Sequence, residues 1–147
     1  MPEINQCVIF AGGKGERLGP ATLNLPKPMY PFRGKPFIHH LIDQMAENGI
    51  TEVIILTGYL EDNIRQYFKK KNVKKIRVRT HFSPVSFNTG ARLKRVEKYL
   101  KKQFLLIYGD NYLPDNIRKI INNYDDQKFD AQVTLYDNED NYSKSNV

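Results

Sequence analysis

Residues 11–29 read AGGKGERLGPATLNLPKPM, and the rest of the chain is arranged around this stretch. Residues 7–10, directly before it, are apolar and include β-branched side chains, which predicts a buried strand. A strand that runs into Gly-Gly-x-Gly exposes several backbone N–H groups with no side chains to keep a ligand away. Because consecutive N–H groups in such a turn form a concave anion site, the loop at Gly12, Gly13 and Gly15 is expected to hold a polyphosphate.

Two basic residues follow this glycine loop closely enough to share its ligand. Arg17 comes shortly after Gly15, and Lys27 stands between Pro26 and Pro28. Because proline fixes its own φ angle, Lys27 projects from a stiff segment. A guanidinium can bind two phosphate oxygens at once, whereas an ammonium is a compact charge suited to a single phosphate. Both side chains are therefore candidates for phosphate binding.

Simpler interpretations of the glycine loop have to be weighed against this one. A lone Gly-x-Gly after a strand is more often a tight turn than a phosphate site. The dinucleotide-binding fingerprint is excluded, because Leu18 stands where its last glycine is needed. The P-loop motif is excluded as well, because Pro36 follows Gly34-Lys35 in place of the required hydroxyl residue.

The longer pattern, with fixed positions from Ala11 to Met29, resembles the N-terminal signature of the sugar-phosphate nucleotidyltransferases. Members of that family join a nucleoside triphosphate to a sugar 1-phosphate and release pyrophosphate, with the help of Mg²⁺. The resemblance extends over essentially the whole chain. It implies nucleotide-binding roles for Ala11, Gly12, Gly13 and Gly15.

Family members usually continue well beyond the length of this chain. The additional part supplies sugar-binding residues and a second metal-binding aspartate. The resemblance therefore implies that residues 1–147 correspond to the N-terminal, nucleotide-binding part of such a protein, either as a fragment of a longer chain or as a naturally shortened protein. On that basis, full catalysis would lack part of its site.

The rest of the chain alternates apolar strands with amphipathic helices. Strands are predicted at residues 7–10, 51–57, 76–82, 104–108 and 131–136. Helices are predicted to open at 35–37, near 61, after 88–90 and at 114–115, and to end near 49, 69, 102 and 124. This alternation indicates an α/β, Rossmann-like, doubly wound and mainly parallel sheet in a single domain. Residues 104–108 are expected at its centre, and residues 76–82 at or near an edge.

Ligands of such sheets bind at the carboxyl ends of the strands, where the strand order reverses. The glycine loop follows the first predicted strand and Gly109-Asp110 follows the fourth. If these two strands are neighbours, Asp110 lies beside the loop, where a carboxylate can bind Mg²⁺ together with phosphate oxygens. Position alone equally allows an aspartate that caps its own turn. The family places a Mg²⁺-binding aspartate in a similar Gly-Asp pair, so the resemblance implies the metal role and makes Arg17, Lys27 and Asp110 the catalytic residues.

Residues 87–93 resemble the family loop whose backbone reads the nucleobase. Thr89, Gly90 and Leu93 agree with that loop, so the resemblance implies that Thr89 and Gly90 bind nucleotide. Arg92 stands where the family has a small residue. There it would either clash with the usual nucleotide pose or add a phosphate contact, which leaves the identity of the nucleobase open.

The net charge of the chain bears on which of three possible functions is favoured. The chain has 23 Lys and Arg against 16 Asp and Glu, and its net charge of +7 suits an anionic ligand. An enzyme that makes a nucleotide-diphospho-sugar is the first interpretation, with guanylyl transfer to a heptose or mannose 1-phosphate the nearest resemblance. A catalytically inactive nucleotide-binding module that acts with a partner is the second. A basic nucleic-acid binder is disfavoured, because the lysines are spread over helix ends with no recognition motif.

The cellular location is expected to be the cytoplasm. No apolar run reaches the length of a membrane span, and no secretory leader is recognisable, so no membrane partner is expected. The single cysteine permits no internal disulfide, which fits a reducing compartment.

Overall fold

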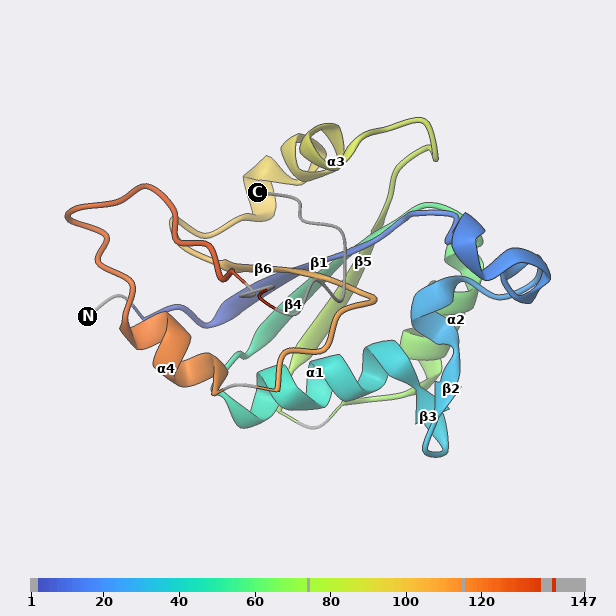
Figure 1. The fold of residues 1–147 in the computed structure, drawn as a ribbon, viewed down its shortest axis with the longest axis horizontal. Coiled ribbons are helices and arrows are strands. Elements are labelled where there is room, and N and C mark those ends of the chain that lie inside the picture. Colours follow the sequence, from blue (N-terminus) through green and yellow to red (C-terminus); the bar gives the residue numbers. More distant parts are fainter. Residues whose placement is uncertain (1–2, 74, 115, 136–138, 140–147) are drawn as a thin grey trace.

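The computed structural model describes residues 3–73, 75–114, 116–135 and 139. The centre of this part of the chain is a four-stranded parallel sheet with the strand order β5-β4-β1-β6 (Figure 1). Its strands are β1 (Gln6–Ala11), β4 (Glu52–Thr57), β5 (Arg77–Phe82) and β6 (Leu105–Tyr108). From β1 the chain moves outward through β4 to β5, and it then crosses back to β6 on the other side of β1.

Helices cover both faces of the sheet (Figure 1). One face packs against α1 (Phe37–Glu47), α2 (Glu61–Lys70) and α4 (Ile117–Asn122), and the other against α3 (Thr89–Arg95) and the 3₁₀ turn η3 (Glu97–Tyr99). The strands β1 and β4 are almost fully buried, because each has a strand on both sides and helices on both faces. The predicted α/β, Rossmann-like, mainly parallel fold is confirmed.

The segment between β1 and α1 forms elements that the sequence analysis did not predict. They are η1 (Glu16–Thr22), η2 (Lys27–Met29) and a hairpin of β2 (Pro31–Phe32) and β3 (Lys35–Pro36). Both turn residues of the hairpin, Arg33 and Gly34, have positive φ angles, as tight two-residue hairpins require. The N–H of Phe37 donates to the carbonyl of Tyr30 at 2.9 Å, which joins the hairpin to the start of α1.

The position predicted for the strand at 104–108 is wrong. Within the described part of the sheet β6 is an edge strand that pairs with β1 alone, and Leu106 and Tyr108 are 42% and 50% exposed. The side chains of Leu105 and Ile107, on its other face, pack against the core around α1 and α4. An apolar run predicts burial, but it carries no information about how many strands flank it. The edge position predicted for residues 76–82 is confirmed, since β5 pairs only with β4 in the same sheet.

The fifth strand predicted at residues 131–136 is also wrong for the residues that the structure describes. Residues 131–135 have no strand conformation, and Val133 and Leu135 are 75% and 69% exposed. The last residue of that prediction, Tyr136, lies outside the described residues. Alternating apolar residues favour a strand, but a strand also needs a neighbour whose backbone groups pair with its own.

The helix predicted to reach residue 102 ends at Arg95 instead. The chain then forms η3 and becomes extended at Leu100. This allows the Gln6 side chain to donate to the Tyr99 carbonyl at 3.0 Å and to accept from the Lys101 N–H at 2.8 Å. These backbone groups would have been used within the helix if it had continued, so the long-range contact with β1 overrides the local helical pattern.

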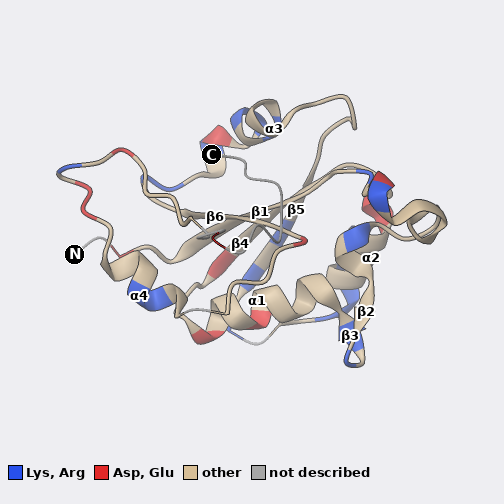
Figure 2. Cartoon of the chain, viewed as in Figure 1, with Lys and Arg blue, Asp and Glu red and all other residues tan. Residues whose placement is uncertain are grey.

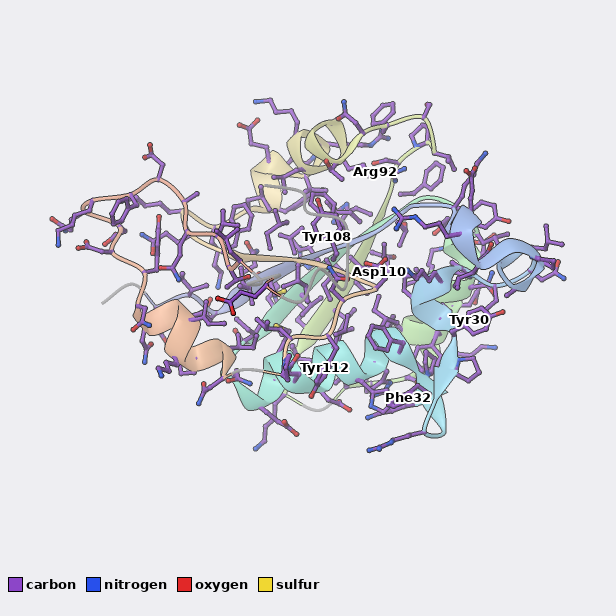
Figure 3. The ribbon with its side chains drawn as sticks, in the orientation of Figure 1. Tyr30, Phe32, Arg92, Tyr108, Asp110 and Tyr112 are labelled. Atoms are coloured by element: carbon purple, nitrogen blue, oxygen red, sulfur yellow. The ribbon has the colours of Figure 1, made fainter. Side chains whose placement is uncertain are left out.

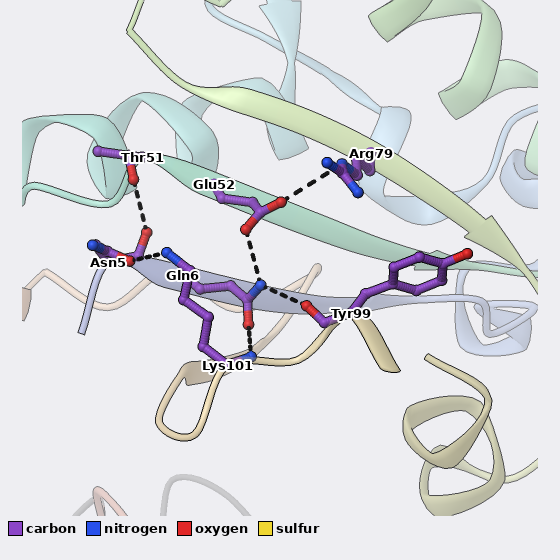
Figure 4. Close-up of polar contacts among 7 residues, drawn as sticks. All are labelled: Asn5, Gln6, Thr51, Glu52, Arg79, Tyr99 and Lys101. Carbon is purple, nitrogen blue, oxygen red and sulfur yellow. Dashed lines mark hydrogen bonds and ion pairs between the residues drawn. The ribbon is translucent and has the colours of Figure 1, made fainter. Parts of the chain in front are cut away.

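A network of polar side chains connects neighbouring strands at the amino-terminal end of the sheet (Figure 4). Besides its two backbone partners, the fully buried Gln6 donates to the Glu52 carboxylate at 3.0 Å, and Glu52 forms an ion pair with Arg79 on β5 at 3.6 Å. The network thus connects β1, β4, β5 and the segment after η3. It lies at the opposite end of the strands from the glycine loop, so its role is structural.

Gln6→Leu is expected to lower the free energy of unfolding by about 1–3 kcal/mol, because it leaves the Lys101 N–H and the Glu52 carboxylate without this buried partner. Gln103 is a matched control, since its side chain makes one hydrogen bond among the described residues, an exposed one to Asp126. Gln103→Leu is expected to change stability by less than about 0.5 kcal/mol. Urea unfolding followed by circular dichroism measures both, and equal effects of the two substitutions would contradict the structural role of Gln6.

Candidate active site

The carboxyl ends of the parallel strands bring together loops that are far apart in the sequence. The glycine loop leaves β1, and Gly109-Asp110 leaves β6, the neighbour of β1. The N–H of Gly109 donates to the Phe10 carbonyl at 2.8 Å, so the two chain segments remain paired up to the loop itself. The strand order reverses between β1 and β6, and this is where open α/β sheets bind ligands.

Within the glycine loop, Gly12 is buried whereas Gly13 is exposed to solvent. Gly15 has a φ angle of +64°, a conformation in which other residues are strained. A Cβ atom on Gly15 would also lie 3.1 Å from the Cβ of Lys27. The close approach at Gly15 therefore lets η2 pack directly against the loop, which places Lys27 at the same end of the sheet.

Lys27 and Asp110 form an ion pair, with Lys27 Nζ 2.8 Å from Asp110 Oδ2. The side chains are 39% and 38% exposed, so both remain accessible from solvent. Among the described residues, Asp110 accepts no hydrogen bond from its own turn, and its partner comes from 83 residues away. The geometry thus favours a role in a shared site over the alternative role of a turn cap.

The residues around Asp110 fit a magnesium ion that arrives with phosphate. No group of three or more His, Cys, Asp or Glu side chains is arranged to hold a metal in the part of the chain that the structure describes. Mg²⁺ commonly takes one or two carboxylates and completes its shell with substrate phosphates and water. Asp110 therefore suits an ion bound jointly with a polyphosphate, and a metal without that ligand would have few protein contacts.

The other predicted site residues lie on exposed segments next to this centre. Arg17 is exposed in η1, and none of the hydrogen bonds or ion pairs among the described residues involves its side chain. Thr89 and Gly90 are exposed at the start of α3, where the Asn88 side chain accepts from the Ala91 N–H at 2.8 Å. The structure thus brings Lys27, Asp110 and the glycine loop together, while no side-chain hydrogen bond or ion pair among the described residues joins Arg17, Thr89 or Gly90 to them.

Tyr59, which was not predicted from the sequence to lie near the site, holds the glycine loop in place through hydrogen bonds. Its N–H donates to the Gly12 carbonyl at 3.2 Å, and its hydroxyl donates to the Thr22 carbonyl at 2.9 Å. Tyr59 belongs to the turn after β4, at the same end of the sheet as the loop. The signal available in the sequence was Gly58, a glycine directly after a buried strand, which permits close approach of another backbone.

Arg92 is buried, with only 5% of its surface exposed. Its guanidinium lies at the carboxyl end of the parallel strands (Figure 3) and donates to backbone carbonyls there. Burial lowers the pKa of Arg92 from its usual range, but a guanidinium stays protonated at neutral pH. The two roles predicted from the sequence, a clash or a phosphate contact, both need an exposed side chain, and the structure supports neither.

The basic residues are spread over several elements of the described chain. Figure 2 shows basic residues on α4, near α3 and in the β2–β3 hairpin, with acidic residues between them. In this view the described basic residues do not line up along one element or face, as they would in a nucleic-acid interface. Among the described helices, none has the length and apolar character needed to cross a bilayer.

The sequence and the fold of this chain are both similar to those of known nucleotidyltransferases. The chain is 30% identical over 115 residues to D-glycero-alpha-D-manno-heptose 1-phosphate guanylyltransferase from Campylobacter jejuni, covering 78% of the chain and 52% of that protein. It is 33% identical to glucose-1-phosphate cytidylyltransferase from Salmonella typhimurium, covering 79% of the chain and 54% of the relative. The crystal structure of HddC from Yersinia pseudotuberculosis superimposes with a TM-score of 0.73 at 31% identity, over 81% of this chain and 53% of that one.

The chain thus spans about half the length of these relatives. The match to the family as a whole extends over residues 6–145, which includes the glycine loop, Lys27, the loop after β5 and Asp110. The family expected from the sequence pattern is confirmed. The protein belongs to the nucleotidyl transferase family.

Proposed function

We propose that the protein binds a nucleoside triphosphate at the carboxyl ends of β1 and β6 and transfers its nucleoside monophosphate to a sugar 1-phosphate. The products of this reaction are a nucleotide-diphospho-sugar and pyrophosphate. The observation that carries the proposal is the convergence of the glycine loop, Lys27 and Asp110 at the point where the strand order reverses. The names of the relatives, a guanylyltransferase and a cytidylyltransferase that act on sugar 1-phosphates, support this reaction class.

The residues divide the work according to their chemistry. The backbone N–H groups of the glycine loop, from Ala11 to Gly15, hold the β- and γ-phosphates. Arg17, with its fork of donors, stabilises the negative charge of the departing pyrophosphate. Lys27 neutralises the α-phosphate or the incoming sugar phosphate. Thr89 and Gly90, at the start of α3, lie in the segment that would contact the nucleoside.

Asp110 is proposed as the ligand of a Mg²⁺ ion that binds together with the triphosphate. When bound, Mg²⁺ neutralises phosphate charge and polarises the phosphorus that is attacked. The contribution of the chain is to hold the carboxylate next to the loop through the Gly109–Phe10 hydrogen bond. Positioning and charge stabilisation account for most of the rate enhancement in phosphoryl transfer. Holding the Asp110 carboxylate beside the glycine loop is therefore the main contribution that the fold makes to the reaction. We place the reaction in the cytoplasm, where nucleoside triphosphates are available.

A second candidate function is nucleotide binding without turnover. It is supported by the residues that the structure brings together, which are the glycine loop, Lys27 and Asp110, all suited to a polyphosphate. The groups assigned to this site are those for a triphosphate, and none of them is assigned to the sugar ring. In this case the chain would act as a nucleotide-binding module with a partner.

Lys27→Met is expected to weaken binding of Mg²⁺-triphosphate by about tenfold to a hundredfold, the effect of losing one charge-assisted hydrogen bond. Lys102 is the matched control, because it is equally basic but is exposed beyond η3, at the other end of the sheet. Calorimetry with the four common triphosphates measures the affinities. Equal affinities of the two variants would remove Lys27 from the site, and no binding of any triphosphate by the wild-type protein would refute the proposed function.

Asp110→Asn is expected to change the affinity for triphosphate differently with and without Mg²⁺. With Mg²⁺ the affinity for triphosphate should fall, because the carboxylate ligand is lost. Without Mg²⁺ the affinity should stay equal or rise, because a negative charge is removed and Lys27 loses its competing partner. The melting temperature should change little, since an ion pair this exposed contributes little stability. A fall in affinity that is the same in both conditions would contradict the metal role.

Residues 1–147 are expected to bind nucleotide but to release pyrophosphate slowly when supplied with mannose, glucose or heptose 1-phosphate. None of the residues assigned above contacts the sugar ring, and an enzyme that loses one group stabilising its transition state is commonly slower by about a hundredfold to a thousandfold. A coupled pyrophosphate assay on this chain decides between the two functions. Rapid turnover would establish the enzyme and eliminate the binding-only alternative, whereas tight binding with no detectable turnover would favour the module.

A further inference from the structure

The buried Arg92 side chain connects three segments of the chain at the carboxyl end of the sheet (Figure 3). It does so entirely through backbone carbonyls, which belong to the end of β4, the loop after β5 and the glycine loop. The acceptors are Thr57 at 2.9 Å, Pro84 at 3.0 Å, Phe87 at 3.1 Å, Ser83 at 3.3 Å, and Val85 and Gly12 at 3.4 Å.

The charge of Arg92 is unusual for a buried group. None of its hydrogen-bond acceptors among the described residues is a carboxylate, so no negative side chain compensates it. Taking a cation out of water is costly unless it is paired, and a buried cation is therefore poor evidence for a role in stability alone. The positive charge lies directly against the glycine loop, where it raises the local potential felt by an anion.

The contact with Gly12 also fixes the direction of a neighbouring donor. The Gly12 carbonyl accepts from Arg92 Nη2 and from the N–H of Tyr59. In a planar trans peptide the carbonyl and the following N–H point in opposite directions. Because the Gly12 carbonyl points toward Arg92, the N–H of Gly13 points away from it, and Gly13 is exposed to solvent.

The glycines around Arg92 leave room for its guanidinium. A Cβ atom on Gly12 would overlap the guanidinium, and a Cβ atom on Gly58 would lie 2.5 Å from Nη1 and 2.7 Å from the Gly12 carbonyl oxygen. The two glycines and the arginine thus form one closely packed unit. The absence of side chains at Gly12 and Gly58 accounts for how a large cation fits beneath the loop.

We propose that Arg92 is a positioning residue for triphosphate binding: it holds the Gly12–Gly13 peptide with its N–H directed away from the protein interior and supplies a fixed positive charge behind it. This proposal rests on the proposed function, because it takes the glycine loop to be the triphosphate site. Arg92 acts on the ligand through the backbone and through its field. It also ties the loop after β5 to the glycine loop, so that phosphate and nucleoside contacts keep a constant spacing.

The test compares Arg92→Met, which removes the charge and donors but keeps much of the volume, with Arg92→Lys, which keeps the charge. Lys94→Met is the matched control, because Lys94 is on the same helix but is exposed and pairs with Glu97. Calorimetry measures the affinity of each folded variant for inorganic tripolyphosphate, and thermal unfolding measures stability separately. We expect Arg92→Met to lose about tenfold or more in affinity, a scale set by one charge acting across a few ångströms at partly shielded dielectric. Arg92→Lys should lose less, and Lys94→Met should match the wild type.

The outcomes separate this proposal from the proposed function. If the wild-type protein binds neither tripolyphosphate nor any nucleoside triphosphate, the proposed function itself fails. If the wild type binds and folded Arg92→Met binds equally well, the positioning role of Arg92 is refuted while the function stands. Should Arg92→Met fail to fold, Arg92→Lys decides: the amide resonance of Gly13 must move and the affinity must fall, and wild-type values for both would refute the proposal.

Discussion

The pairing of β1 with β4 on one side and β6 on the other is the constraint on which the rest of the structure depends. It buries all of β1 except Phe10, which is partly exposed, and makes the carboxyl end of β1 the meeting point of segments distant in the sequence. Parallel strands all end at the same edge of the sheet, so the glycine loop and Asp110 must emerge side by side. The hydrogen bond from Gly109 to Phe10 extends this pairing to the last residue before the site.

Charge placement around this meeting point follows from backbone packing more than from side-chain pairing. The Lys27–Asp110 ion pair is too exposed to contribute much stability, so its significance lies in where it holds the two groups. Arg92, in contrast, is buried and bonded only to carbonyls among the described residues. The fold thus holds the Arg92 cation on the buried side of the glycine loop and the Lys27 and Asp110 side chains on its solvent-accessible side. This arrangement suits a polyanionic ligand that binds together with a metal ion.

Much of the fold could be predicted from local patterns, because β1, β4 and α1 each carry a continuous or helical run of apolar residues. The errors concern contacts between distant residues. The edge position of β6 and the absence of strand structure at residues 131–135 depend on which strands find neighbours. The proximity of Lys27 to Asp110 could be predicted, because both were expected at the carboxyl ends of neighbouring strands, and the structure joins them in an ion pair; their roles in binding and catalysis stay predictions. The partners of Arg92 are carbonyls with no sequence signature, and only the structure identifies them.

The proposed function depends most directly on the glycine loop as the site where phosphate binds. Nuclear magnetic resonance of the ¹⁵N-labelled protein, titrated with Mg²⁺ and a non-hydrolysable nucleoside triphosphate, tests this residue by residue. The amide resonances of Gly13 and Gly15 are predicted to shift most, followed by those around Lys27 and Asp110. Unmoved glycine-loop resonances, with shifts confined to α4 or the β2–β3 hairpin, would contradict the account.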